Sequence, residues 1–177
     1  MLNKKTLSDI HARFRQLRSG ELADNLAVQG IKYRIAWGVE SYKLKDIAQE
    51  FEASVELAEA LWTEDVRESK MIATRLFPAK EMTTEKALSW AREAKYTEIA
   101  DQLCMNLFSR IPSSVELAET LSKSDSELEE YIALKLATRI EAKSDSVLVL
   151  ANDILSKDYP IYLKTAALWY KQIYDQE

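Results

Sequence analysis

The feature of this sequence that most constrains its fold is an internal repeat. The segment Ser-Val-Glu-Leu-Ala-Glu stands at residues 54–59 and again at residues 114–119. Segments of similar pattern begin near residues 84 and 146, which places the starts of the units about thirty residues apart. Repeats of this length are typical of helical solenoids, in which each unit is a hairpin of two helices that stacks on its neighbours.

The apolar residues inside each unit have helical spacing. Leu57, Leu61 and Trp62 lie on one stripe of a helix, and the segment that begins at residue 114 repeats this stripe. First helices of the units are expected at about 54–62, 84–94, 114–122 and 146–156, and second helices at about 66–77, 97–108, 127–141 and 161–174. Three further helices are expected earlier in the chain, at about 4–18, 21–28 and 41–51.

Prolines and capping residues mark the expected helix boundaries. Proline lacks the backbone N–H and clashes with the preceding turn, so Pro78, Pro112 and Pro160 are expected outside helix interiors. Ser or Thr side chains at positions 54, 83, 113 and 146 can cap the helices that follow them. The sequence therefore predicts an all-α fold: an α-α superhelix of stacked antiparallel helix pairs, formed by a single domain over residues 1–177.

The composition argues against several classes of function. The chain has one histidine, His11, one cysteine, Cys104, and only three glycines, which argues against catalytic triads, zinc clusters and phosphate-binding loops. No metal or other cofactor is expected. Cys104 lies between Leu103 and Met105 on an expected helix, which favours a place in the core. An unbroken apolar run of about 18 residues and a signal peptide are both missing, so the sequence predicts a cytoplasmic protein with no membrane partner.

Positive charge is unevenly distributed between the two sets of helices. The formal net charge is −5, but the second helices of the units are less acidic than the first helices. One helix set lines one face of a solenoid, so a less acidic face can follow a phosphate backbone. A nucleic acid, DNA or RNA, is therefore a candidate partner, and the alternative is a non-catalytic scaffold that binds a protein or peptide. The basic residues expected on this face are Arg67, Lys70, Arg75, Lys135, Arg139, Lys164 and Lys171.

Several short segments resemble a known family. They are Gly-Val at 38–39, Leu-Lys-Asp-Ile-Ala at 44–48, Val-Arg-Glu-Ser-Lys-Met-Ile-Ala at 66–73 and Asp-Gln-Leu-Cys-Met-Asn-Leu-Phe at 101–108. In order and spacing they resemble the AlkD-like DNA alkylation repair proteins, which are built from HEAT-like repeats. The resemblance implies an α-α superhelix of HEAT or armadillo type. In this family the helical arc holds duplex DNA and acts as a glycosylase on N3- or N7-alkylated purines.

The resemblance also implies a catalytic carboxylate. Asp101 matches the family residue that stabilises the positive charge that develops on deoxyribose as the glycosidic bond breaks. Thr97 stands where the family has a tryptophan, and Tyr96 is the aromatic residue beside it. The family's tryptophan in the last helix aligns with Leu168, so Trp169 is displaced by about 100° around the helix axis. Tyr96 and Trp169 are the aromatic residues expected to contact DNA.

An arginine of the family also has no direct counterpart. Its position falls near Ala133 or Leu134, and Lys135 is the nearest cation. Two implications of the resemblance stay open, namely excision of alkylated bases and DNA binding without excision.

Overall fold

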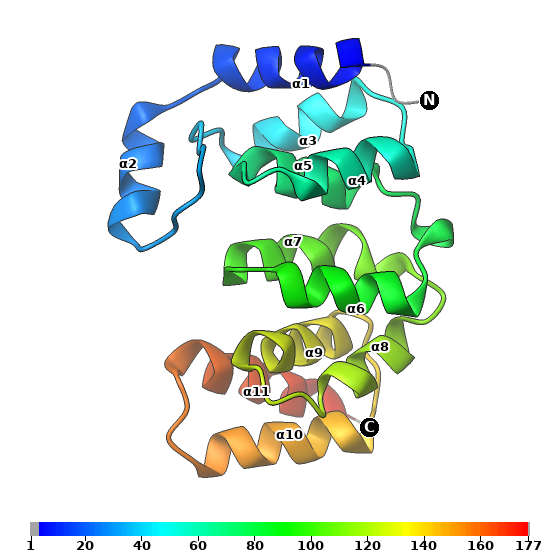
Figure 1. Ribbon diagram of the computed structural model, residues 1–177. Coiled ribbons are helices and arrows are strands. Elements are labelled where there is room, and N and C mark those ends of the chain that lie inside the picture. Colours follow the sequence, from blue (N-terminus) through cyan, green and yellow to red (C-terminus); the bar gives the residue numbers. More distant parts are fainter. Residues whose placement is uncertain (1–3, 177) are drawn as a thin grey trace. The chain divides into compact units, whose positions relative to one another are not determined.

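A computed structural model describes residues 4–176 of the chain, and over this range the regular elements are helices (Figure 1). The one β-type contact in the described range is an isolated bridge between Ile35 and Val66. The predicted all-α fold is thus confirmed. The chain divides into two compact units, residues 1–81 and residues 82–177, which are described separately below. The prediction of a single domain stays a prediction.

Over its described residues, 4–81, the first unit contains five α-helices and one short 3-10 helix. Its α-helices are α1 (Lys4–Gln16), α2 (Gly20–Val28), α3 (Ser41–Gln49), α4 (Val55–Thr63) and α5 (Arg67–Leu76), and η1 (Ala79–Glu81) follows them. Helix α5 packs against both α3 and α4. The side chain of Ser54 accepts the backbone N–H of Leu57, as expected for a helix cap.

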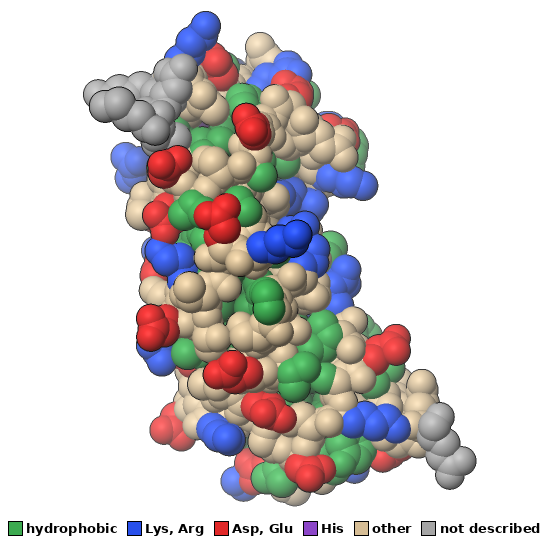
Figure 2. Space-filling model, turned by 90° about the vertical axis from the view of Figure 1, so that its right-hand side faces the viewer, with side chains coloured by type: hydrophobic (Ala, Val, Ile, Leu, Met, Phe, Trp, Pro, Cys, Tyr) green, Lys and Arg blue, Asp and Glu red, His purple; other side chains and the backbone are tan. Residues whose placement is uncertain are grey.

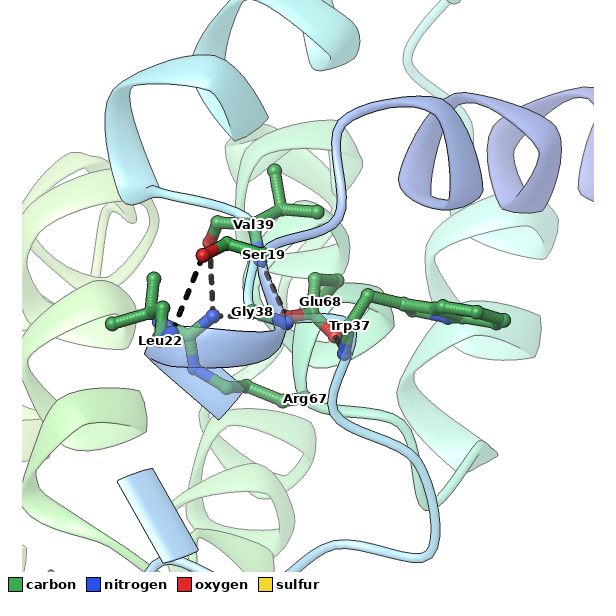
Figure 3. Close-up of polar contacts among 7 residues, drawn as sticks. All are labelled: Ser19, Leu22, Trp37, Gly38, Val39, Arg67 and Glu68. Carbon is green, nitrogen blue, oxygen red and sulfur yellow. Dashed lines mark hydrogen bonds and ion pairs between the residues drawn. The ribbon is translucent and has the colours of Figure 1, made fainter. Parts of the chain in front are cut away.

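An irregular segment between α2 and α3 is held by a buried carboxylate (Figure 3). Glu68, on α5, has no exposed surface, and its two oxygens accept the backbone N–H groups of residues 37, 38 and 39 at 3.0–3.2 Å. Arg67 pairs with the same carboxylate at 2.9 Å and donates to the carbonyl oxygen of Val39 at 3.0 Å. This network supplies hydrogen bonds to a segment that has no helix or sheet of its own.

Gly38 lies inside this network in the left-handed backbone region. Its φ angle is +68°, and the backbone of Ser19 and Ala23 lies against the place where a Cβ atom would stand. Trp37, the preceding residue, accepts the backbone N–H of Ser19 through its carbonyl oxygen at 3.0 Å. A residue without a side chain is therefore required where this segment crosses the start of α2.

In the described part of the second unit, residues 82–176, six α-helices form two rows. Helix α9 packs against α7 and α11 in one row, while α8 packs against α6 and α10 in the other (Figure 1). Pairs α8–α9 and α10–α11 connect the rows, as expected for stacked helix hairpins. The elements are α6 (Thr84–Glu93), α7 (Thr97–Asn106), η2 (Phe108–Arg110), α8 (Ser114–Leu121), α9 (Glu127–Arg139), α10 (Asp145–Ser156) and α11 (Ile161–Tyr174).

Two of the expected helix caps in the second unit differ from prediction. Thr83 accepts the backbone N–H of Lys86 as predicted, whereas Ser113 stands at the cap position of α8 without a capping hydrogen bond from its side chain. The prediction that Ser146 caps a helix is wrong, because α10 begins at Asp145 and Ser144 precedes it. Ser144 instead donates its hydroxyl to Glu119 at 2.9 Å.

Cys104 lies in the core of the second unit. It is 2% exposed, and its Sγ atom lies 3.7 Å from the carbonyl oxygen of Ile132. Burial, followed by the nearby Asp101 carboxylate, raises the pKa of the Cys104 thiol. The predicted place of Cys104 in the core is confirmed by its burial, and a thiol that resists ionisation is a poor nucleophile.

Charged and apolar side chains share the surface of the protein. On the face shown in Figure 2, basic and acidic side chains lie interspersed with hydrophobic ones. Among the described helices, none has both the length and the apolar character that crossing a lipid bilayer requires.

Candidate functional site

Two of the predicted DNA-contacting cations are buried in the first unit. The exposed fractions of Arg67 and Lys70 are 3% and 7%. Arg67 is bound to Glu68 and to the Val39 carbonyl oxygen, as described above. Lys70 donates to the carbonyl oxygen of Trp62 at 2.6 Å, and its ammonium lies 4.4 Å from the centre of that residue's ring. Both charges are engaged inside the unit, and this placement speaks against the expected phosphate contacts.

The second unit has a pocket of about 890 Å³ on the row formed by α7, α9 and α11. It brings together four of the predicted site residues, Asp101 from α7, Lys135 and Arg139 from α9, and Trp169 from α11. Their convergence follows from the packing of α9 between α7 and α11. The remaining lining residues are Glu98, Gln102, Cys104, Met105, Ser109, Thr138 and Ile140.

Asp101 is held by two residues of α9. Its Oδ1 atom accepts a hydrogen bond from the hydroxyl of Tyr131 at 3.0 Å and lies 3.3 Å from the Nζ atom of Lys135. Tyr131 and Lys135 are four residues apart, so they project from the same face of α9. The carboxylate therefore has both a neutral donor and a cation on one of its oxygens.

Lys135 is surrounded by groups that attract a positive charge. Its ammonium lies 5.0 Å from the ring centre of Trp169 and 5.7 Å from that of Tyr131. Both distances fall within the range of cation-π interactions. We refer to Asp101, Tyr131 and Trp169 as the cation box. In this structure the box is occupied by the protein's own Lys135.

Tyr131 is a site residue that the sequence did not identify as such. An aromatic residue at helical spacing is usually a packing residue, and Tyr131 is only 7% exposed. Burial, followed by the charge and the hydrogen bond of Asp101, raises the pKa of the Tyr131 phenol. The phenol therefore stays protonated and donates to Asp101. The one sequence signal was its distance from Asp101, which equals one repeat and places the two on neighbouring helices of the same row.

Three other predicted site residues do not line this pocket. Tyr96 is the residue that precedes α7, and Lys164 lies 3.7 Å from Asp158 near the start of α11. Lys171 donates to Asn152 of α10 at 2.8 Å. It follows Trp169 by two residues, which turns it by about 200° around the helix axis and away from the pocket.

Comparison with known proteins agrees with this architecture. The sequence matches the family described as DNA alkylation repair enzyme over residues 10–160. A search of the curated proteins finds no match.

The fold is similar to that of a solved structure described as "A new family of proteins related to the HEAT-like repeat DNA glycosylases with affinity for branched DNA structures". The two chains are 16% identical with a TM-score of 0.79, and the alignment covers 97% of this chain and 75% of the other. This likeness confirms the predicted HEAT-like fold. Because the family match spans most of the sequence, the chain belongs to the DNA alkylation repair enzyme family.

Proposed function

We propose that this protein binds DNA through the pocket-bearing face of α7, α9 and α11. The observation that carries the proposal is the half-exposed indole of Trp169, which lies in one pocket with the cations Lys135 and Arg139. An aromatic surface beside cations suits a nucleic acid, because bases stack on the ring while phosphates are attracted to the charges. Membership of the family supports this proposal, as does the affinity for branched DNA stated for the proteins of similar fold.

We further propose that the protein binds without efficient excision of N3- or N7-alkylated purines. Excision requires an anion that stabilises positive charge on the sugar in the transition state. In the cation box, Lys135 already offsets the charge of Asp101 at 3.3 Å. The electrostatic stabilisation that Asp101 can give to a positively charged sugar is therefore weak. We expect binding to be the main activity of the site.

DNA binding is expected to be salt-sensitive and to depend on Trp169 and Arg139. We expect Trp169→Ala to weaken binding by about 1–3 kcal/mol through lost stacking. Arg139→Gln is expected to reduce the slope of log affinity against log salt by about 1. Fluorescence anisotropy with a labelled duplex and a labelled four-way junction, between about 50 and about 200 mM salt, measures both effects.

Lys171→Gln is the matched control for this experiment, because Lys171 carries a positive charge on the same helix but contacts α10. Its affinity is expected to equal that of the wild type. Absence of salt-dependent binding to either DNA would contradict the proposal and favour the protein-binding scaffold. The same duplex with 7-methylguanine tests excision: base release by the wild type that Asp101→Asn abolishes would show that the site is catalytic.

A further inference from the structure

We propose that Lys135 closes the cation box against external ligands, and that the box accepts a planar organic cation, such as an N-alkylated nucleobase, once Lys135 leaves it. The inference rests on the proposed function in that it concerns the same pocket. The inference goes beyond the proposed function because it assigns Lys135 the role of a specificity-determining residue. An ammonium and a cationic base compete for the same carboxylate and the same aromatic surface, so one excludes the other.

The box has the groups that an external cation needs. Asp101 supplies the negative charge, and the hydroxyl of Tyr131 fixes its Oδ1 atom at 3.0 Å. Trp169 supplies an indole, and because this residue is 50% exposed, ring surface is available for stacking. The adjoining pocket of about 890 Å³ provides space for a planar group beside the ring.

The position of Lys135 allows it to leave. Its side chain is 25% exposed and that of Asp101 is 36% exposed, so water reaches both partners of the ion pair. While it is formed, the pair compensates the charge of Asp101, but it separates at little net cost because water solvates both ions. The four-carbon stem of lysine then gives the ammonium several alternative positions.

Lys70 shows the opposite arrangement within the same protein. Its ammonium also lies over a tryptophan, at 4.4 Å from the ring centre of Trp62, but the residue is only 7% exposed. It also donates to the carbonyl oxygen of Trp62 at 2.6 Å. Lys70 is therefore a fixed part of the core of its unit, whereas Lys135 lies at the wall of an open pocket.

The test is isothermal titration calorimetry with 7-methylguanosine, below the pH at which it loses its positive charge, and with neutral guanosine as the comparison ligand. We expect Lys135→Gln and Lys135→Ala to bind 7-methylguanosine on the order of tenfold more tightly than the wild type. Guanosine affinity is expected to stay unchanged, because a neutral base gains nothing from an uncovered carboxylate.

Three further variants separate closure of the box from general changes in charge. Lys135→Arg keeps a cation at the box and is expected to bind as weakly as the wild type. Lys123→Gln removes one positive charge from an exposed position outside the pocket and is expected to have no effect. Adding Asp101→Asn to Lys135→Gln is expected to abolish the gain in affinity for 7-methylguanosine, since the carboxylate is the counter-charge of the ligand.

An equal affinity of Lys135→Gln, Lys135→Ala and the wild type for 7-methylguanosine would overturn the inference. A gain that survives Asp101→Asn, or that guanosine shares, would overturn it as well. DNA binding by the wild type is measured separately by anisotropy. Failure of DNA binding with a gain in nucleoside affinity contradicts only the proposed function, and the reverse result contradicts only the closure of the box by Lys135.

Discussion

Replacing Glu68 with glutamine is expected to lower the free energy of unfolding by about 3–5 kcal/mol. The carboxylate is completely buried and accepts three backbone N–H groups in addition to the charge of Arg67. Glutamine has nearly the same shape, but it removes the charge opposite Arg67 and directs an amide N–H toward backbone donors. Urea unfolding followed by circular dichroism measures the change. A loss of this size is a large part of the stability of an ordinary domain.

A second Glu–Arg pair in the same unit provides the control. Glu50 accepts from Arg13 at 2.5 and 2.9 Å, but both side chains are more than 40% exposed. Glu50→Gln is therefore expected to change stability much less than Glu68→Gln, because water solvates the partner that is left behind. In the double variant Arg67→Met, Glu68→Gln, the loss is expected to be smaller than the sum of the single losses. Equal effects of the two Glu→Gln changes would contradict a structural role for the buried charge.

Replacing Gly38 with alanine is expected to lower the free energy of unfolding by about 2–4 kcal/mol. The Cβ atom would overlap the carbonyl oxygen of Ser19 and would stand 2.8 Å from the backbone nitrogen of Ala23. Both neighbours are main-chain atoms, so relief requires a movement of the start of α2 or of the segment bound to Glu68. The positive φ of +68° adds strain to any residue with a side chain. The same urea experiment measures the loss.

Gly30→Ala separates strain from steric overlap. Gly30 also has a positive φ, of +84°, but no atom lies within 4 Å of the place that its Cβ would occupy. Its substitution is therefore expected to cost about 1 kcal/mol, from the backbone conformation alone. A Gly38→Ala protein no less stable than Gly30→Ala would show that α2 adjusts freely, contrary to the contacts described here.

The helices were predictable because their signals are local. Apolar spacing and proline breaks located α4 to α11 to within a few residues, and a serine or threonine side chain caps α4 and α6 as expected. The network around Glu68 was not predictable. It joins α5 to backbone groups about 30 residues earlier, and a hydropathy pattern contains no information on where those N–H groups point.

The pocket was predictable only in part, for a similar reason. The repeat placed Asp101, Lys135 and Trp169 on successive helices of one row, and these helices do pack together. The direction of each side chain depends on finer detail, as Lys171 shows by facing α10. The burial of Arg67 and Lys70 was missed because their partners include the backbone carbonyl oxygens of Val39 and Trp62, which no residue-type pattern reveals.

The buried thiol in the wall of the pocket is a built-in probe of how often the neighbouring helices separate. Cys104 is the single cysteine of the chain and lines the pocket from α7, yet it is 2% exposed and lies against the backbone of α9. An alkylating reagent reaches it only during moments when α7 separates from α9. The rate of alkylation in the native protein therefore reports how often this pair of helices opens, a quantity that spans the range from local fluctuation to global unfolding.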